Sequence, residues 1–173
     1  MGKMRRFVRT GSFCCLFFIL VGILFWLFHE RYVIRLINRT QDRLFFSRKI
    51  SPGDRFTFKY IHSVQKTPVY EIFTIDEEGN VILVETRVMS LGYGLPAPTR
   101  DDEYTIEEDF LVIRNLHRNV GKLMIRVNFV RRMEIDFGQQ TFDLREYGRP
   151  GDLIEVSAAR KSWIRGTMGR VEE

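Results

Sequence analysis

Two residues with acid–base chemistry, His62 and Glu71, lie in neighbouring stretches where apolar and polar side chains alternate. Such alternation predicts two β-strands joined by a tight connection. If the apolar side chains of both strands share one face, Tyr60 lies opposite Phe73, and His62 therefore lies opposite Glu71. A carboxylate in that position would fix the tautomer of the imidazole ring.

This predicted pair has three interpretations. It closes the end of a hydrophobic core, it binds a ligand or a partner, or it serves an enzyme as an acid–base pair. Ser63 does not complete a hydrolase site with His62, since neighbours in a strand point to opposite faces. Moving the register by one residue would set Lys59 opposite Phe73 and mix polar with apolar partners, so we reject that register.

A second candidate site is Gly92, Tyr93 and Gly94, near the start of a predicted loop from Ser90 to Asp109. The two glycines permit backbone conformations that other residues resist. They do not form a dinucleotide-binding fingerprint, because no third glycine and no helix follow. A loop of this length is functional or mobile, so we expect either a tight turn beside the His62 strand or a loop that contacts a ligand.

The sequence carries no pattern for a metal ion or a cofactor. Its three histidines are not spaced as a zinc pair, and the acidic residues between positions 101 and 109 lack the spacing of a calcium loop. Both cysteines, Cys14 and Cys15, fall in the apolar N-terminal segment, which leaves the remainder without a disulfide framework or a thiolate metal site. We therefore expect no metal, no cofactor and no catalytic residue that can be assigned.

The N-terminal segment predicts a membrane anchor. Residues 10–29 contain no Asp, Glu, Lys or Arg, and a helix of that length spans about 30 Å, enough to cross a bilayer. A cleaved signal peptide is the main alternative, but the run ends in Trp26-Leu27-Phe28 without the small residues of a cleavage site. Arginines also follow the segment, yet a long domain translocates largely regardless of charge. We expect the N-terminus inside the cytoplasmic membrane and the domain outside.

The distribution of charge argues against nucleic acid as a partner. Four of the 27 basic residues lie in the first nine positions, so the rest of the chain carries 23 basic and 22 acidic residues. A nucleic-acid-binding domain carries a basic face on the domain itself. The nearly neutral remainder of this chain does not fit that class.

After the anchor the hydrophobic pattern predicts short strands and no helix. The turns Ser51–Asp54 and Pro150–Asp152 share a Pro-Gly-Asp sequence, in which glycine supplies a positive φ. We predict an all-β fold, a small antiparallel β-sandwich or open barrel preceded by one N-terminal transmembrane helix. The predicted parts are a cytoplasmic head at 1–9, an anchor at 10–29, an extracytoplasmic β-domain at 30–160 and a C-terminal tail at 161–173. Predicted strands cover 32–37, 44–46, 56–62, 71–75, 81–88, 110–116, 123–130, 132–137, 141–144 and 153–157.

Two short motifs carry a resemblance to a known family. They are Tyr60-Ile61-His62-Ser63-Val64, continued by Thr67-Pro68-Val69 and Glu71, and Gly92-Tyr93-Gly94-Leu95-Pro96. On these motifs residues 36–158 resemble the family of domain of unknown function 1850. The resemblance implies a small membrane-tethered protein encoded with a TRAP transporter of the TAXI type, which has a solute receptor and a large permease. It implies no established enzymatic activity.

The resemblance, together with the predicted anchor and β-domain, implies a membrane-anchored extracytoplasmic accessory protein of a TAXI-type TRAP transporter. A tether raises the effective concentration of a binding domain near the permease. The alternatives are a membrane-anchored hydrolase-like enzyme that uses His62 and Glu71, and a free-standing envelope protein. An enzyme predicts a deep pocket with polar groups converging on His62, and an accessory domain predicts a shallow, partly apolar patch. The candidates for contact with receptor, permease or solute are His62, Ser63, Glu71, Gly92, Tyr93 and Gly94.

Overall fold

The computed structural model describes residues 19–20, 32–89, 103–128 and 130–160. Contacts divide the chain into two units, Met1–Glu30 and Arg31–Glu173. Of the first unit only Ile19 and Leu20 are described, and both are helical. In the described part of the chain, no helix is long and apolar enough to cross a membrane. Four predicted features lie outside the described residues. They are the head at 1–9, the anchor apart from positions 19 and 20, the segment 90–102 and the tail 161–173.

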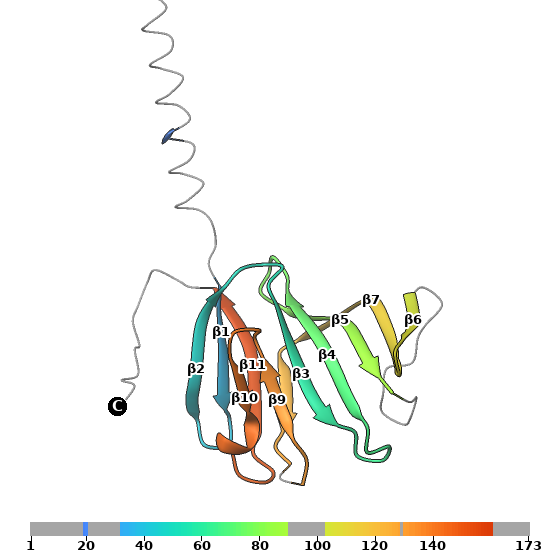
Figure 1. Cartoon of the computed structure of the whole chain (residues 1–173). Helices are drawn as coiled ribbons and strands as arrows, with labels where there is room; N and C mark the ends of the chain where they lie inside the picture. The colour runs from blue at the N-terminus through green and yellow to red at the C-terminus, as the bar shows by residue number, and fades with distance from the viewer. Residues whose placement is uncertain (1–18, 21–31, 90–102, 129, 161–173) are drawn as a thin grey trace, which may run out of the picture. The chain divides into compact units, whose positions relative to one another are not determined.

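The described residues of the second unit form β-strands and one short 3-10 helix. These elements form a small sheet with the strand order β2-β1-β11-β8 and a large sheet with the order β10-β9-β3-β4-β5-β7-β6 (Figure 1). Every strand pair is antiparallel, so the predicted all-β antiparallel fold is confirmed as a sandwich of two sheets. The elements are β1 (Tyr32–Asn38), β2 (Arg43–Ile50), β3 (Arg55–Ile61), β4 (Pro68–Ile75), β5 (Val81–Val88), β6 (Glu103–Glu107), β7 (Phe110–Gly121), β8 (Leu123–Arg126), β9 (Met133–Asp136), β10 (Thr141–Asp143), η1 (Leu144–Glu146) and β11 (Leu153–Arg160).

Strand β6 corrects the prediction of an unbroken loop from Ser90 to Asp109. Its residues alternate, with Tyr104 and Ile106 on one face and acidic or hydroxyl side chains on the other. Residues 103–107 form a strand rather than a loop because they pair with β7 along their whole length, and their side chains are exposed to solvent. Strand β7 also continues past its predicted end, through bulges in its pairing with β5.

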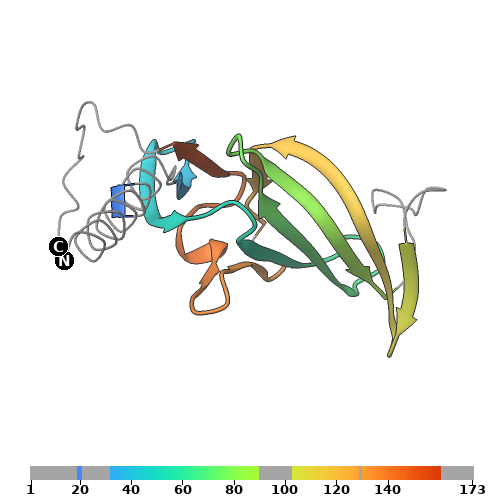
Figure 2. The ribbon, with the colours of Figure 1, turned by 90° about the horizontal axis from the view of Figure 1, so that it is seen from above.

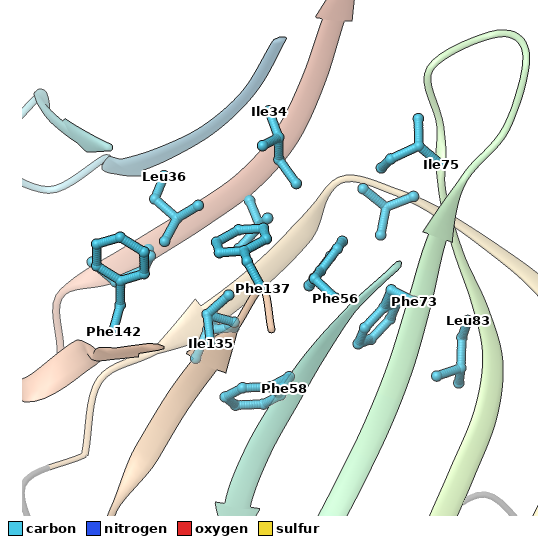
Figure 3. Packing of buried hydrophobic residues seen from close by; sticks show 14 of the residues in the cluster. Ile34, Leu36, Phe56, Phe58, Phe73, Ile75, Leu83, Ile135, Phe137 and Phe142 are labelled. Atoms are coloured by element: carbon cyan, nitrogen blue, oxygen red, sulfur yellow. The ribbon is translucent and has the colours of Figure 1, made fainter. Parts of the chain in front are cut away.

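The hydrophobic core lies between the two sheets and contains a chain of aromatic contacts (Figure 3). The ring of Phe73 on β4 stacks on Phe56 of β3, with ring centroids 5.2 Å apart. Phe56 lies 5.6 Å from Phe137, and Phe137 lies 5.2 Å from Phe46 of β2. Because β2 belongs to the small sheet and β4 to the large one, these contacts join the two sheets, and aromatic pairs add to the stabilisation from burial.

The second Pro-Gly-Asp turn ties β11 to β1 through Asp152. One carboxylate oxygen, Oδ2, accepts hydrogen bonds from the side chains of Asn38 at 2.8 Å and Gln41 at 2.6 Å, and from the Arg149 backbone N–H at 2.9 Å. These donors, Asn38 first, hold the pKa of Asp152 below its ordinary value. Gly151 has the positive φ, +90°, that its place in the turn predicted.

The large sheet reaches beyond the small one. Figure 2 shows β5, β7 and β6 extending away from β1, β2 and β11, with β6 at the far end.

Candidate functional site

The predicted register between β3 and β4 is wrong by four residues. Phe73 faces Phe56 rather than Tyr60, so Glu71 does not face His62. Because a strand rises about 3.3 Å per residue, this shift separates Glu71 from His62 by about 13 Å along the strands. The described strands therefore do not form the direct histidine–carboxylate pair on which the hydrolase alternative depended.

A short turn determines the observed register. The His62 N–H donates to the Thr67 carbonyl oxygen at 2.9 Å, and the Lys66 N–H donates to the His62 carbonyl oxygen at 3.2 Å. A register shift of four residues preserves the alternation of faces, so both registers keep the apolar side chains together. The observed connection, from His62 to Thr67, is shorter than the connection from His62 to Glu71 in the predicted register, so closing it costs less chain entropy. It requires a left-handed conformation at Lys66, whose φ is +59°.

His62 holds this turn in place. Its side chain is buried, and Nδ1 accepts hydrogen bonds from the backbone N–H groups of Val64 at 3.4 Å and Gln65 at 3.2 Å. Since Nδ1 is an acceptor, the neutral ring carries its proton on Nε2. Ser63 is exposed in the same turn, and its carbonyl oxygen accepts a hydrogen bond from Arg131 at 2.7 Å.

Glu71 has a different polar neighbour from the one predicted. The Tyr60 hydroxyl donates to Glu71 Oε1 at 3.3 Å. Thr86 lies directly opposite Glu71 on β5, is fully buried, and among the described residues its Oγ1 has no hydrogen-bond partner. Burial raises the pKa of the Glu71 carboxyl, and burial together with the charge of Glu71 raises the pKa of Tyr60.

The sequence did not lead us to predict the cluster of Tyr60, Glu71 and Thr86, although it contains one indication that Tyr60 can be the partner of Glu71. Tyr60 and His62 lie on the same face of the same strand, so either was available as a partner for Glu71. Only the register decides between them. Gly92, Tyr93 and Gly94 lie outside the described residues.

Replacing Glu71 with glutamine is expected to stabilise the protein at pH 8. A carboxyl whose pKa is raised by folding contributes stability below its unfolded pKa, and that contribution is lost as the pH rises through the folded pKa. The Glu71→Gln protein should therefore have the higher free energy of unfolding at pH 8, and the difference should shrink toward pH 4. Chemical denaturation at both pH values measures this. Glu77→Gln, at an exposed turn residue, should change the free energy by less than about 0.5 kcal/mol, and equal behaviour of the two variants would contradict the expectation.

One face of the large sheet leads from this cluster to the edge of the sheet. Glu71 faces Thr86, Thr86 faces Ile113, and Ile113 faces Tyr104. Tyr104 and Ile106 belong to β6, the outermost strand, and are 62% and 80% exposed. Large apolar side chains exposed at a sheet edge mark a surface for interaction. We call Tyr104 and Ile106, with the β6 backbone that carries them, the β6 edge.

No group of three or more His, Cys, Asp and Glu side chains in the described part of the chain is arranged to hold a metal ion. The polar groups of the candidate site are instead a phenol, a carboxyl and a hydroxyl. They offer proton exchange and hydrogen bonding to a partner or ligand.

Comparison with known proteins places the chain in a family. The family model described as Domain of unknown function (DUF1850) matches residues 56–144. No curated protein and no solved structure matches the chain. The matched range runs from β3 to the start of η1 and includes His62, Glu71 and the β6 edge. Because the match covers more than half of the chain, the protein belongs to the DUF1850 family.

Proposed function

We propose that this protein is a membrane-anchored extracytoplasmic accessory subunit of a TAXI-type TRAP solute transporter. Its binding surface is the β6 edge, which lies in the same cross-strand rows as Glu71 and Tyr60. The proposal is carried by the exposure of Tyr104 and Ile106 in the same cross-strand rows as the buried polar cluster. The partner that this surface suits best is a protein component of the transporter, the receptor or the permease.

The β6 edge suits the addition of a strand from a partner. Within the described residues β6 pairs only with β7, so its outer backbone N–H and C=O groups face away from the sheet. An added strand satisfies these groups and brings alternate side chains against Tyr104 and Ile106. The other face of β6 carries Glu103 and Glu107. A partner strand with apolar residues on one face and basic residues on the other is complementary to this edge.

The predicted anchor supports the same function. Residues 10–29 would hold the β-domain beside the membrane, with the basic residues 1–9 in the cytoplasm. A domain confined near its partner needs only modest affinity, because tethering raises the effective concentration. A small apolar edge is sufficient for such an interaction.

The test is a pull-down of the tagged full-length protein from its native membrane in mild detergent, with mass spectrometry of the proteins recovered. We expect a TRAP permease or receptor with the wild type. The double variant Tyr104→Ser/Ile106→Ser should reduce recovery at least about tenfold, because two apolar side chains no longer become buried on binding. His62→Ala and Glu71→Ala test the other end of the same face.

The control is Leu44→Ser/Met124→Ser, which removes two exposed apolar side chains, 50% and 45% exposed, that belong to β2 and β8 of the small sheet. It should leave recovery unchanged. If folded protein comes down without any transporter component in every case, the proposal is wrong, and a screen for hydrolase activity becomes the next experiment.

A further inference from the structure

A groove of about 480 Å³ lies on the face of the large sheet opposite to Glu71. Lys59 faces Tyr70, Tyr70 faces Arg87, and Arg87 faces Val112, so these side chains form one cross-strand row. Tyr70 is the neighbour of Glu71 in β4 and therefore points the other way. The groove is thus separate from the polar cluster and from the exposed side chains of the β6 edge.

The floor of the groove is apolar and aromatic. The rings of Tyr70 and Phe110 meet edge to face, with centroids 5.6 Å apart and planes at 70°. Ile72 and Val112 complete the floor, and Val112 is only 1% exposed. The volume falls within the range of small-molecule sites, and a few polar groups around an apolar floor are typical of such sites.

The charged side chains around the groove are nearly all paired with one another. Lys59 binds Asp136. Two further pairs follow the same pattern, Arg87 with Glu85 at 2.6 Å and Arg114 with Glu107 at 2.6 Å.

Glu108 is the exception. It lines the groove from the turn between β6 and β7, and among the described residues it has no ion pair and no side-chain hydrogen bond. The groove and its immediate pairs therefore have one negative charge in excess. A cation finds an unpaired carboxylate at Glu108, whereas an anion meets only cations that already have a carboxylate partner, Lys59 with Asp136 and Arg87 with Glu85.

We propose that this groove binds a small organic cation, an amine or a guanidine with an aromatic or aliphatic body. The cationic group pairs with Glu108, and the body packs on Tyr70 and Phe110. An aromatic ring attracts a cation through its face, which adds to the charge interaction. This binding site goes beyond the proposed accessory function, because it lies on the other face of the sheet and takes a ligand of a different class.

The experiment is a titration of the full-length protein in non-ionic detergent with 4-phenylbutylamine, followed by the methyl NMR signals of Ile72 and Val112. The matched probe 4-phenylbutyrate has the same body and the opposite charge. We expect the amine to move both signals saturably and the carboxylate to bind at least about fivefold more weakly, the size of one ion pair at a solvated site.

Three variants test the residues. Glu108→Gln should weaken binding of the amine about fivefold, and Tyr70→Leu, which keeps an apolar side chain, should weaken it about threefold. Glu77→Gln removes an exposed carboxylate outside the groove and should leave binding unchanged. The inference is overturned if the amine gives no saturable shift, if the carboxylate binds as tightly as the amine, or if Glu108→Gln binds as the wild type does. None of these outcomes depends on recovery of a transporter component, so the two proposals fail separately.

Discussion

Replacing Phe73 with alanine is expected to lower the free energy of unfolding by about 3 to 5 kcal/mol. Phe73 is 1% exposed and stacks on Phe56 at the start of the aromatic chain that joins the two sheets (Figure 3). The variant loses the buried ring and leaves a cavity that the neighbouring strands, held by their backbone hydrogen bonds, close only in part. Since a small domain has only about 5 to 15 kcal/mol of stability, this is a large share.

Tyr104→Ala is the matched control, because it removes an aromatic ring of similar size from the same sheet. Tyr104 is 62% exposed, so its loss should change the free energy of unfolding by no more than about 0.5 kcal/mol. Chemical denaturation of both variants measures the difference. A Phe73→Ala protein as stable as Tyr104→Ala would show that the aromatic contacts between the sheets do not hold the fold. The pair also separates folding from binding, since Tyr104 belongs to the proposed partner surface.

Glu155→Gln is expected to cost about 1 to 3 kcal/mol of unfolding free energy at pH 7, the size of hydrogen bonds to a charged group. Glu155 is 4% exposed. Arg39 donates to both of its oxygens, at 2.7 and 2.9 Å, and the Ser157 hydroxyl donates at 2.7 Å. The lower half of the range is the better expectation, because solvent around the half-exposed Arg39 screens the ion pair.

The pH dependence of this effect has a definite sign. The hydrogen bond from Arg39 is the main cause that lowers the pKa of Glu155 from 4.5 to about 2. A carboxyl whose pKa is lowered by folding contributes stability above its unfolded pKa, and that contribution is lost as the pH falls through the folded value. The wild type and Glu155→Gln should therefore converge in stability between about pH 4.5 and pH 2. If chemical denaturation shows the same difference in free energy of unfolding between the two proteins over this whole range, Arg39 does not lower the pKa of Glu155 as described.

Glu71→Gln should show the opposite pH dependence, with a higher free energy of unfolding than the wild type at high pH. The two carboxyls differ in what surrounds them. Glu155 accepts hydrogen bonds from a guanidinium and a hydroxyl, which stabilise its charge. Glu71 has one long hydrogen bond from a phenol and is otherwise desolvated. Burial of a carboxyl therefore raises or lowers its pKa according to the donors that accompany it.

The strands and turns of this protein follow from its sequence. Alternation of apolar and polar side chains has a period of two, which is a local property, so β1, β3 and β5 were located without knowledge of their partners. The Pro-Gly-Asp turns were found in the same way, because Gly53 and Gly151 adopt the positive φ that only glycine adopts easily. Membership of the DUF1850 family was also visible in short motifs of the chain.

The register and the edge strand required the tertiary structure. A shift of four residues between β3 and β4 leaves every side chain on its face, so alternation cannot distinguish the two pairings, and the turn at His62 decides between them. Strand β6 has an alternating pattern of its own but gains its strand conformation by pairing with β7. The sequence predicted a loop there because the glycines and prolines that precede it interrupt the series of short strands.

The sites depend on the order of strands in the sheet, which no local pattern contains. Tyr60, Glu71 and Thr86 come from three different strands, and the groove gathers residues from β9, β3, β4, β5, β6 and β7. The sequence by itself determined which residues point to the same side of each strand. Packing between residues far apart in the chain decides which of those strands are neighbours and in which register they pair. Only the tertiary structure therefore assembles the residues of the Glu71 cluster, and separately those of the Tyr70 groove.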